Sequence, residues 1–217
     1  MNKQHRLRGL YAITHATLTP DANIVPAVEQ AIMGGCQIVQ YRDKSVDHTH
    51  RLQQAQALQQ LCQQHHALFI INDDIELARQ VNADGVHLGR EDGNITEARQ
   101  RLGDDSIIGI SCYNQLELAI QAEQQGADYV AFGSFFSSRV KPDAIRAEPA
   151  LLQQAQQKLT IPVVAIGGID QHNAASLINQ GADMLAVISA IFAEDDIQQA
   201  ASTLATLFDP LTPALSP

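Results

Sequence analysis

Short apolar runs alternate with amphipathic segments along the whole chain. Runs of large aliphatic residues bounded by glycine, proline or polar residues predict buried strands. The segments between them carry apolar residues three or four positions apart, which predicts helices. The predicted strands cover residues 10–13, 38–41, 68–71, 85–88, 107–111, 129–132, 163–166 and 184–188. The predicted helices cover residues 21–33, 49–65, 75–81, 95–102, 115–125, 149–158, 173–179 and 195–207.

One short phrase recurs where a helix gives way to a strand. Gln-Gly-Ala-Asp at 125–128 returns at 180–183, and a weaker copy stands at 81–84. Each copy stops a helix, makes a tight turn and enters a buried strand, so one supersecondary unit is repeated. Such units in series predict a single (β/α)₈ TIM barrel over residues 9–208, with 209–217 as a flexible, proline-rich tail. A doubly wound open sheet is the alternative, but no GxGxxG follows the first strand.

Composition narrows the class of protein. The 217 residues are 45% hydrophobic and 18% charged, a globular profile, and the net charge of −10 argues against nucleic-acid and anionic-membrane partners. The three cysteines (Cys36, Cys62 and Cys112) are scattered without CxxC spacing, as in reduced cytosolic proteins. The first residues lack the apolar core of a secretory signal, and no apolar run is long enough to span a bilayer. We expect a soluble, cytoplasmic protein, and the sequence leaves a homo-oligomer open.

Charged residues follow three successive predicted strands. Arg42, Asp43 and Lys44 follow the second strand, residues 72–74 the third, and residues 90–92 the fourth. In parallel α/β folds the carboxyl ends of the strands are where chemistry is placed. Cations beside paired acids at this edge suggest an anionic substrate held partly by side chains and partly by a metal.

Two of these acids suit magnesium. Mg²⁺ takes a few carboxylate oxygens and keeps its other positions for water and substrate phosphates. Asp73 and Asp92, on adjacent strand ends, fit that pattern, and no cluster has zinc spacing. Asp74 and Glu91 are better interpreted as N-caps of the helices that follow.

Other polar groups predict anion binding. By period-two alternation Gln40 and Arg42 share one side of the second strand, so both can face the mouth of the barrel. Lys141 lies in the long segment 133–148, which is typical of a lid or binding loop. Gly167-Gly168 after strand seven and Ser189 after strand eight occupy the loops where such barrels hold phosphate, although a glycine pair also fits a simple tight turn.

His87 and Cys112 have less reactive interpretations. His87 sits inside an apolar strand and is expected to be a core histidine with its polar atoms satisfied. Cys112 has no partner histidine placed by the sequence, so a small core residue is favoured over a nucleophile.

Taken together, these motifs closely resemble the thiamine-phosphate synthase family. The match runs in order from Gly9 to about Ala193. It rests on residues 40–44, 71–73, 86–92, 109–111, 133–141, 165–169 and 188–190. The resemblance implies a (β/α)₈ barrel that joins hydroxymethylpyrimidine diphosphate to a thiazole phosphate, with Mg²⁺ as cofactor.

The resemblance also implies roles for individual residues. The residues implied at the pyrimidine diphosphate site are Gln40, Tyr41, Arg42, Asp43, Lys44, Asn72, Ser111 and Lys141, of which Arg42, Lys44, Ser111 and Lys141 would be catalytic. The residues implied at the thiazole phosphate are Ser138, Arg139, Val140, Gly168, Ile188 and Ser189. Asp73 and Asp92 would hold Mg²⁺.

The chain departs from the family pattern at three places. Residues 138–141 replace the usual Thr-x-Thr-Lys, so that Val140 lacks a hydroxyl; Ser134 stands for the usual proline, and Tyr113 for a frequent histidine. These changes are expected to affect the affinity for the thiazole phosphate more than the reaction itself.

Two alternative functions would use the same barrel without the coupling reaction: that of a thiazole tautomerase-like paralogue, and that of a non-catalytic protein that binds thiamine precursors. A sugar-phosphate isomerase would need two placed acid/base groups, which the sequence does not supply.

Overall fold

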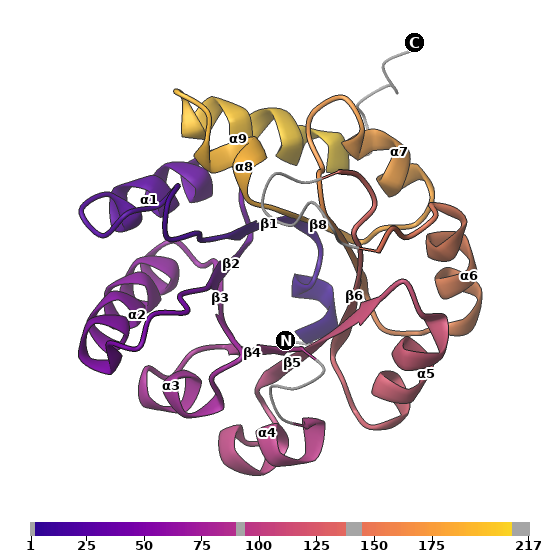
Figure 1. Ribbon diagram of the computed structural model, residues 1–217, viewed down its shortest axis with the longest axis horizontal. Helices are drawn as coiled ribbons and strands as arrows, with labels where there is room; N and C mark the ends of the chain where they lie inside the picture. Colours follow the sequence, from indigo (N-terminus) through magenta and orange to yellow (C-terminus); the bar gives the residue numbers. More distant parts are fainter. Residues whose placement is uncertain (1–2, 90–93, 138–144, 210–217) are drawn as a thin grey trace.

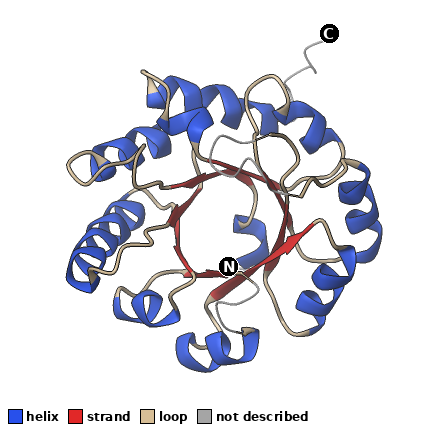
Figure 2. Ribbon diagram, viewed as in Figure 1, coloured by secondary structure: helices blue, strands red, loops and turns tan. Residues whose placement is uncertain are grey.

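The computed structural model is a closed barrel of eight parallel strands, which follow one another around the ring in chain order (Figures 1 and 2). It describes residues 3–89, 94–137 and 145–209. The strands are β1 (Gly9–Ile13), β2 (Ile38–Tyr41), β3 (Leu68–Asn72), β4 (Gly85–Leu88), β5 (Ile107–Tyr113), β6 (Tyr129–Phe132), β7 (Val163–Ile166) and β8 (Met184–Val187). The predicted TIM barrel is confirmed.

Helices cover the outside of the barrel (Figure 2). They are α1 (Ile24–Met33), α2 (His48–Gln64), α3 (Ile75–Gln80), α4 (Ile95–Leu102), α5 (Leu116–Gln124), α6 (Ala150–Lys158), α7 (Ala174–Asn179), α8 (Ser189–Phe192) and α9 (Ile197–Ala205), with 3₁₀ turns η1 (Lys3–Arg6) and η2 (Thr206–Phe208). In the described part of the chain, no helix combines the length and apolar character needed to cross a bilayer.

The predicted and observed boundaries differ mainly at helix ends. The first helix begins at Ile24 rather than at residue 21, because residues 21–23 form a turn. The last helix begins at Ile197, after the N-cap Asp196, and ends in the 3₁₀ turn η2. The sequence missed η1 and α8, since four-residue helices are too short to show a helical period.

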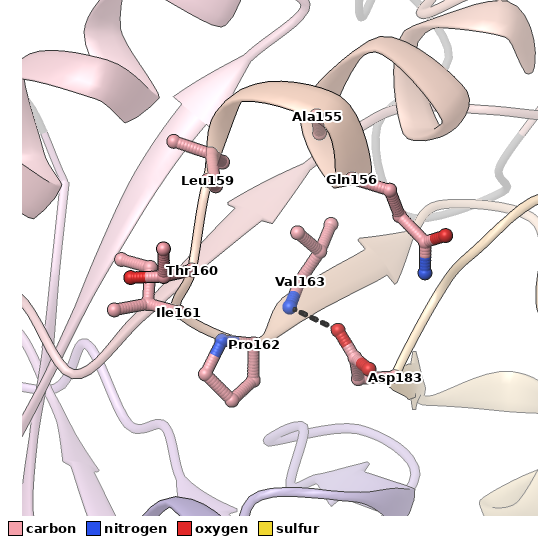
Figure 3. Close-up of a pocket in the computed structure, with 8 residues that line it drawn as sticks. All are labelled: Ala155, Gln156, Leu159, Thr160, Ile161, Pro162, Val163 and Asp183. Carbon is pink, nitrogen blue, oxygen red and sulfur yellow. Dashed lines mark hydrogen bonds between the residues drawn. The ribbon is translucent and has the colours of Figure 1, made fainter.

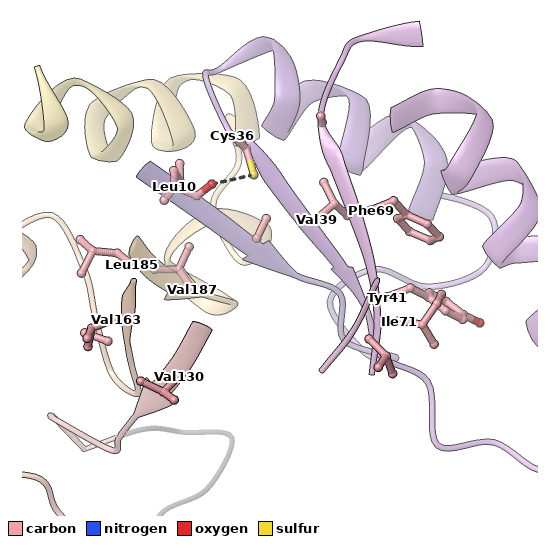
Figure 4. Packing of buried hydrophobic residues seen from close by; sticks show 14 of the residues in the cluster. Leu10, Cys36, Val39, Tyr41, Phe69, Ile71, Val130, Val163, Leu185 and Val187 are labelled. Atoms are coloured by element: carbon pink, nitrogen blue, oxygen red, sulfur yellow. Dashed lines mark hydrogen bonds between the residues drawn. The ribbon is translucent and has the colours of Figure 1, made fainter. Parts of the chain in front are cut away.

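Side chains pack in two separate cores. Alternate residues of each strand face inward, so Tyr11, Ile38 and Ile70 fill the barrel, while Val39 and Phe69 pack outward against the helices. Figure 4 shows this outer layer, where the buried Cys36 thiol donates to the carbonyl of Leu10 at 3.5 Å. The inward alternation carries the polar residues at the strand ends to the axis of the barrel.

The N-terminal end of the barrel is closed by the start of the chain. Leu7, 1% exposed, packs in the inner core with Leu68 and Met184. The turn η1 therefore lies across this end, and Figure 1 shows it within the ring of strands. The opposite end, where the strands terminate, forms the mouth.

The recurring aspartates have a structural role at the N-terminal end. Asp84, Asp128 and Asp183 each accept a backbone N–H from the start of the preceding strand at 2.8 Å, from Phe69, Ile108 and Val163 respectively. Their own backbone N–H groups donate back to the carbonyls of the same three residues. The repeat therefore ties the start of each odd-numbered strand from β3 to β7 to the strand that follows it. Figure 3 shows the bond between Asp183 and Val163.

Candidate active site

The end of β2 sends consecutive side chains to opposite sides of the sheet. Gln40, only 3% exposed, lies inside the barrel and donates from Nε2 to the Tyr11 hydroxyl at 2.8 Å. Tyr41 packs in the outer core instead (Figure 4). Its hydroxyl donates to Gln54 on α2 at 2.8 Å. The pleat of the strand turns the Tyr41 side chain away from the barrel interior, and the expected contact between Tyr41 and the substrate stays a prediction.

The segment after β2 is held by polar contacts. Thr14, buried after β1, accepts the backbone N–H of Arg42 at 2.9 Å, while its own N–H donates to the carbonyl of Gln40. Asp43 accepts from the backbone and the hydroxyl of Ser45 at 2.7 and 2.9 Å, which closes a turn. The sequence did not single out Thr14, although a polar residue directly after a strand was the available signal.

This turn places Lys44 beside the end of β3. Its Nζ lies 3.3 Å from Oδ2 of Asp73, with side chains 63% and 26% exposed. Asp73 has a φ of 65°, a left-handed conformation that aspartate tolerates better than most residues, and its N–H donates to the carbonyl of His87 at 2.9 Å. The structure thus joins a predicted phosphate-binding cation to a predicted metal ligand.

The next residue, Asp74, has a different role. Its Oδ1 accepts the N–H of Leu77 at 2.8 Å, and its Oδ2 pairs with Arg51 of α2 at 2.8 Å. This confirms the prediction that Asp74 is the N-cap of α3. The matching expectation for Glu91 is wrong as regards α4, whose N-cap is Asn94; Glu91 itself lies outside the described residues.

A chain of buried hydrogen bonds runs through the barrel to Ser111. His87 contacts the Tyr129 hydroxyl through Nδ1 at 3.0 Å and the Ser111 hydroxyl through Nε2 at 2.9 Å. Tyr129 in turn contacts Tyr11 at 2.9 Å. His87 is therefore a core histidine whose two ring nitrogens both have partners, as predicted. The sequence missed the two tyrosines, whose signal was a polar-tipped aromatic residue at inward positions of two strands.

The surroundings of two further residues of β5, Gly109 and Cys112, account for their residue types. Gly109 faces inward, where a Cβ would meet the Tyr129 ring, so only glycine fits beside that tyrosine. Cys112 is fully buried on the outer side, and burial raises the pKa of its thiol to about 12. The thiol stays protonated, which agrees with the prediction of a core residue rather than a nucleophile.

The opposite side of the mouth is formed by the ends of β7 and β8. Gly167 and Gly168 have φ of 102° and 63°, and a Cβ on either would meet the backbone or side chains of residues 134–137. The pair is therefore required for the turn and for close approach of the segment after β6. Ile188 packs against the inner core as the N-cap of α8, which begins at Ser189. Short extra helices in this position hold phosphate in many barrels.

Several predicted site residues lie outside the described residues: Asp92, Ser138, Arg139, Val140 and Lys141. The described residues contain no group of three or more histidine, cysteine or acidic side chains close enough for a metal. The partly exposed Asp73 carboxylate nevertheless fits Mg²⁺, which uses one or two protein carboxylates together with substrate phosphates.

Two cavities of the described structure lie away from the mouth. One, of about 200 Å³, lies between α6 and the start of β7 and includes Asp183 (Figure 3). The other, of about 420 Å³, lies at the N-terminal end beside η1 and the turn after α2. In parallel barrels chemistry is placed at the carboxyl end, so neither cavity is the candidate active site.

Comparison with known proteins agrees with this geometry. Residues 10–191 match the family model described as thiamine monophosphate synthase. A thiamine-phosphate synthase of Alcanivorax borkumensis is 53% identical over 94% of this chain and 95% of its own length. A second, of Thioalkalivibrio sulfidiphilus, is 50% identical over 94% and 97%. The solved thiamine phosphate pyrophosphorylase of Pyrococcus furiosus superposes with a TM-score of 0.86 at 37% identity, over 95% of this chain and 97% of that one.

Proposed function

The chain belongs to the thiamine monophosphate synthase family and is a transferase of thiamine biosynthesis, and from this premise we propose how its barrel mouth works. The substrates are 4-amino-2-methyl-5-(diphosphooxymethyl)pyrimidine and 4-methyl-5-(2-phosphoethyl)thiazole. The products are thiamine monophosphate and pyrophosphate. The observation that carries the proposal is the approach of Lys44 to Asp73 at 3.3 Å, since it brings a cation and a carboxylate from two strands to one point of the mouth.

The pyrimidine diphosphate occupies the side formed by β2 to β5. Gln40, Asn72 and Ser111 are at inward positions of their strands, which supports contacts with this substrate. Arg42 and Lys44, with Lys141 outside the described residues, supply positive charge to the diphosphate. Asp73, with Asp92 also outside them, would hold a Mg²⁺ ion, which would neutralise charge on the departing pyrophosphate.

The thiazole phosphate occupies the side formed by β7 and β8. The first N–H groups of a helix have no acceptor within the helix and favour an anion. The start of α8 at Ser189, beside Ile188 and Gly168, supports this assignment. Ser138, Arg139 and Val140 complete this side of the proposed site.

The reaction itself needs little from the protein beyond charge and position. The bond between the pyrimidine methylene carbon and the diphosphate oxygen breaks, and its electron pair leaves with pyrophosphate. The aminopyrimidine stabilises the resulting cation, and the thiazole nitrogen then donates its lone pair to the methylene carbon. No proton is transferred in forming the new bond, so no general base is required. The side chains act by positioning both substrates and by stabilising the leaving group electrostatically.

The test mixes the purified protein with both substrates and Mg²⁺ and measures pyrophosphate release. The proposal expects release that requires the thiazole phosphate as well as the pyrimidine diphosphate. A thiazole tautomerase-like paralogue would leave the diphosphate intact, and a non-catalytic sensor would bind either substrate without releasing pyrophosphate. Removing the metal with a chelator is expected to abolish release, and restoring Mg²⁺ is expected to recover it.

A further inference from the structure

A chain of buried polar groups in the barrel interior ends at Ser111, at the mouth. It runs from Gln40 through Tyr11, Tyr129 and His87 to Ser111, in steps of 2.8, 2.9, 3.0 and 2.9 Å. Its inner members are withdrawn from water, with Tyr11 1%, Tyr129 0% and His87 9% exposed. A buried donor left without an acceptor costs about 1–3 kcal/mol, so the protons of this chain have few arrangements open to them.

The direction of each bond follows from counting protons. Gln40 donates its amide N–H to the Tyr11 oxygen. The single proton of Tyr11 then has the Tyr129 oxygen as its acceptor, because the opposite direction would leave it buried without one. By the same reasoning the Tyr129 hydroxyl donates its hydrogen bond to Nδ1 of His87, which therefore carries no proton of its own.

The two aromatic rings hold this geometry. His87 and Tyr129 stack with centroids 5.6 Å apart and planes at 20°, and Tyr11 meets Tyr129 edge-on at 6.2 Å and 72°. Burial raises the pKa of both tyrosines above the ordinary value, so each remains a neutral hydroxyl with one proton to donate. Both hydroxyls are therefore available as hydrogen-bond donors in the chain.

We propose that His87 is a positioning residue: held as the Nε2–H tautomer, it donates to the Ser111 oxygen and leaves the Ser111 hydroxyl proton free to donate into the mouth. The acceptor of this hydrogen bond would be a diphosphate oxygen of the pyrimidine substrate, and in this respect the proposal rests on the proposed function. A serine that both accepts from histidine and donates to an oxyanion is a stronger donor than an isolated hydroxyl. The barrel interior would thus set the orientation of a group at the site.

The first test reads the tautomer without any reaction. Long-range ¹H–¹⁵N spectra of the full-length protein with ¹⁵N-labelled histidine distinguish Nδ1–H from Nε2–H. The His87 signal is assigned by its loss in His87→Gln. The Nε2–H form is expected, and Tyr129→Phe is expected to convert part of it to Nδ1–H. An Nδ1–H form in the unaltered protein would overturn the proposal, whether or not the protein releases pyrophosphate, so the outcome is independent of the proposed function.

The second test is a double-mutant cycle in steady-state kinetics. Tyr129→Phe is expected to lower kcat/KM for the pyrimidine diphosphate about tenfold, the effect of one well-placed hydrogen bond, with KM for the thiazole phosphate unchanged. In a Ser111→Ala background the same change is expected to cost little more, because its effect passes through that hydroxyl. Additive losses would contradict the proposal.

The controls separate positioning from folding. Ser106→Ala removes a hydroxyl that donates to the carbonyl of Leu102 at 2.8 Å, at the start of β5 and far from the mouth. Any change in kcat/KM caused by Ser106→Ala is expected to be additive with the change caused by Ser111→Ala. If Tyr129→Phe does not fold, Tyr11→Phe removes the chain one step earlier, and a loss of kcat/KM that is fully additive with that of Ser111→Ala would contradict the proposal.

Discussion

The two ends of this barrel use aspartate in opposite ways. At the N-terminal end, Asp84, Asp128 and Asp183 have their carboxylates bonded to backbone N–H groups of neighbouring strands. At the mouth, Asp73 faces a lysine and solvent. The carboxylates at the N-terminal end satisfy backbone N–H donors that would otherwise be unpaired. The carboxylate of Asp73 at the mouth remains available to a ligand. In TIM barrels the carboxyl end carries the chemistry and the opposite end the stability, and here one residue type serves both.

The contrast is sharpest between two adjacent residues, Asp73 and Asp74. Asp74 is committed to the helix α3 and to Arg51, but Asp73 is held by its backbone and its carboxylate faces Lys44. Adjacent acids can thus differ completely in role. Substitutions at four aspartates test the separation between those that stabilise the fold and the one that acts at the mouth.

The largest expected effect is on activity at the mouth. Asp73→Asn keeps the size of the side chain and tolerates the φ of 65°, yet removes the charge. We expect kcat/KM for the pyrimidine diphosphate to fall on the order of 100-fold or more, as when one electrostatic group of an active site is removed. Urea unfolding is expected to change by less than about 0.5 kcal/mol. Full activity would show that Asp73 does not act in the reaction.

The second effect is on stability at the opposite end. Asp128 accepts from Ile108 and pairs with Arg99 at 2.8 Å, so Asp128→Ala leaves a backbone donor and a guanidinium without this partner. We expect a loss of about 2–3 kcal/mol in the free energy of unfolding, measured with urea. The kcat of the folded protein is expected to be unchanged. Asp128→Asn, which keeps an acceptor, is the matched control and should lose less.

The third effect tests the neighbour of Asp73. Asp74→Ala removes the N-cap of α3 and the partner of Arg51, and we expect it to cost about 1–2 kcal/mol of stability. Its kcat/KM is expected to stay close to that of the unaltered protein. A loss of activity as large as that of Asp73→Asn would contradict the separation of roles between the two residues.

The smallest effect is a pH dependence. Burial raises the pKa of Asp183 above its ordinary value of 3.8, so in the window between the two values the folded state holds a proton that the unfolded chain has released. Stability from this group therefore falls as the pH rises through the window and is constant above it. The unfolding free energy of the unaltered protein minus that of Asp183→Asn, followed by urea unfolding at several pH values, is expected to decline accordingly. A difference that rises with pH would contradict the assignment.

The sequence by itself determined the architecture and much of the mouth. Alternating buried strands and amphipathic helices specify a barrel, because each repeated unit buries its apolar face only when the ring closes. Polar residues directly after the strands then have to meet at one edge. This reasoning predicted Gln40, Arg42, Lys44 and Asp73 there without any knowledge of distances, and the structure brings Lys44 and Asp73 together.

Only the tertiary structure decided how individual side chains are used. The recurring aspartates look in sequence like part of a turn, yet their partners lie about 15–20 residues away on a neighbouring strand. Tyr11, Tyr129 and His87 come from three separate strands, and only closure of the barrel brings their polar atoms within hydrogen-bonding distance. The local period fixes which way a side chain faces, but the partner it meets depends on the register and closure of strands distant in sequence.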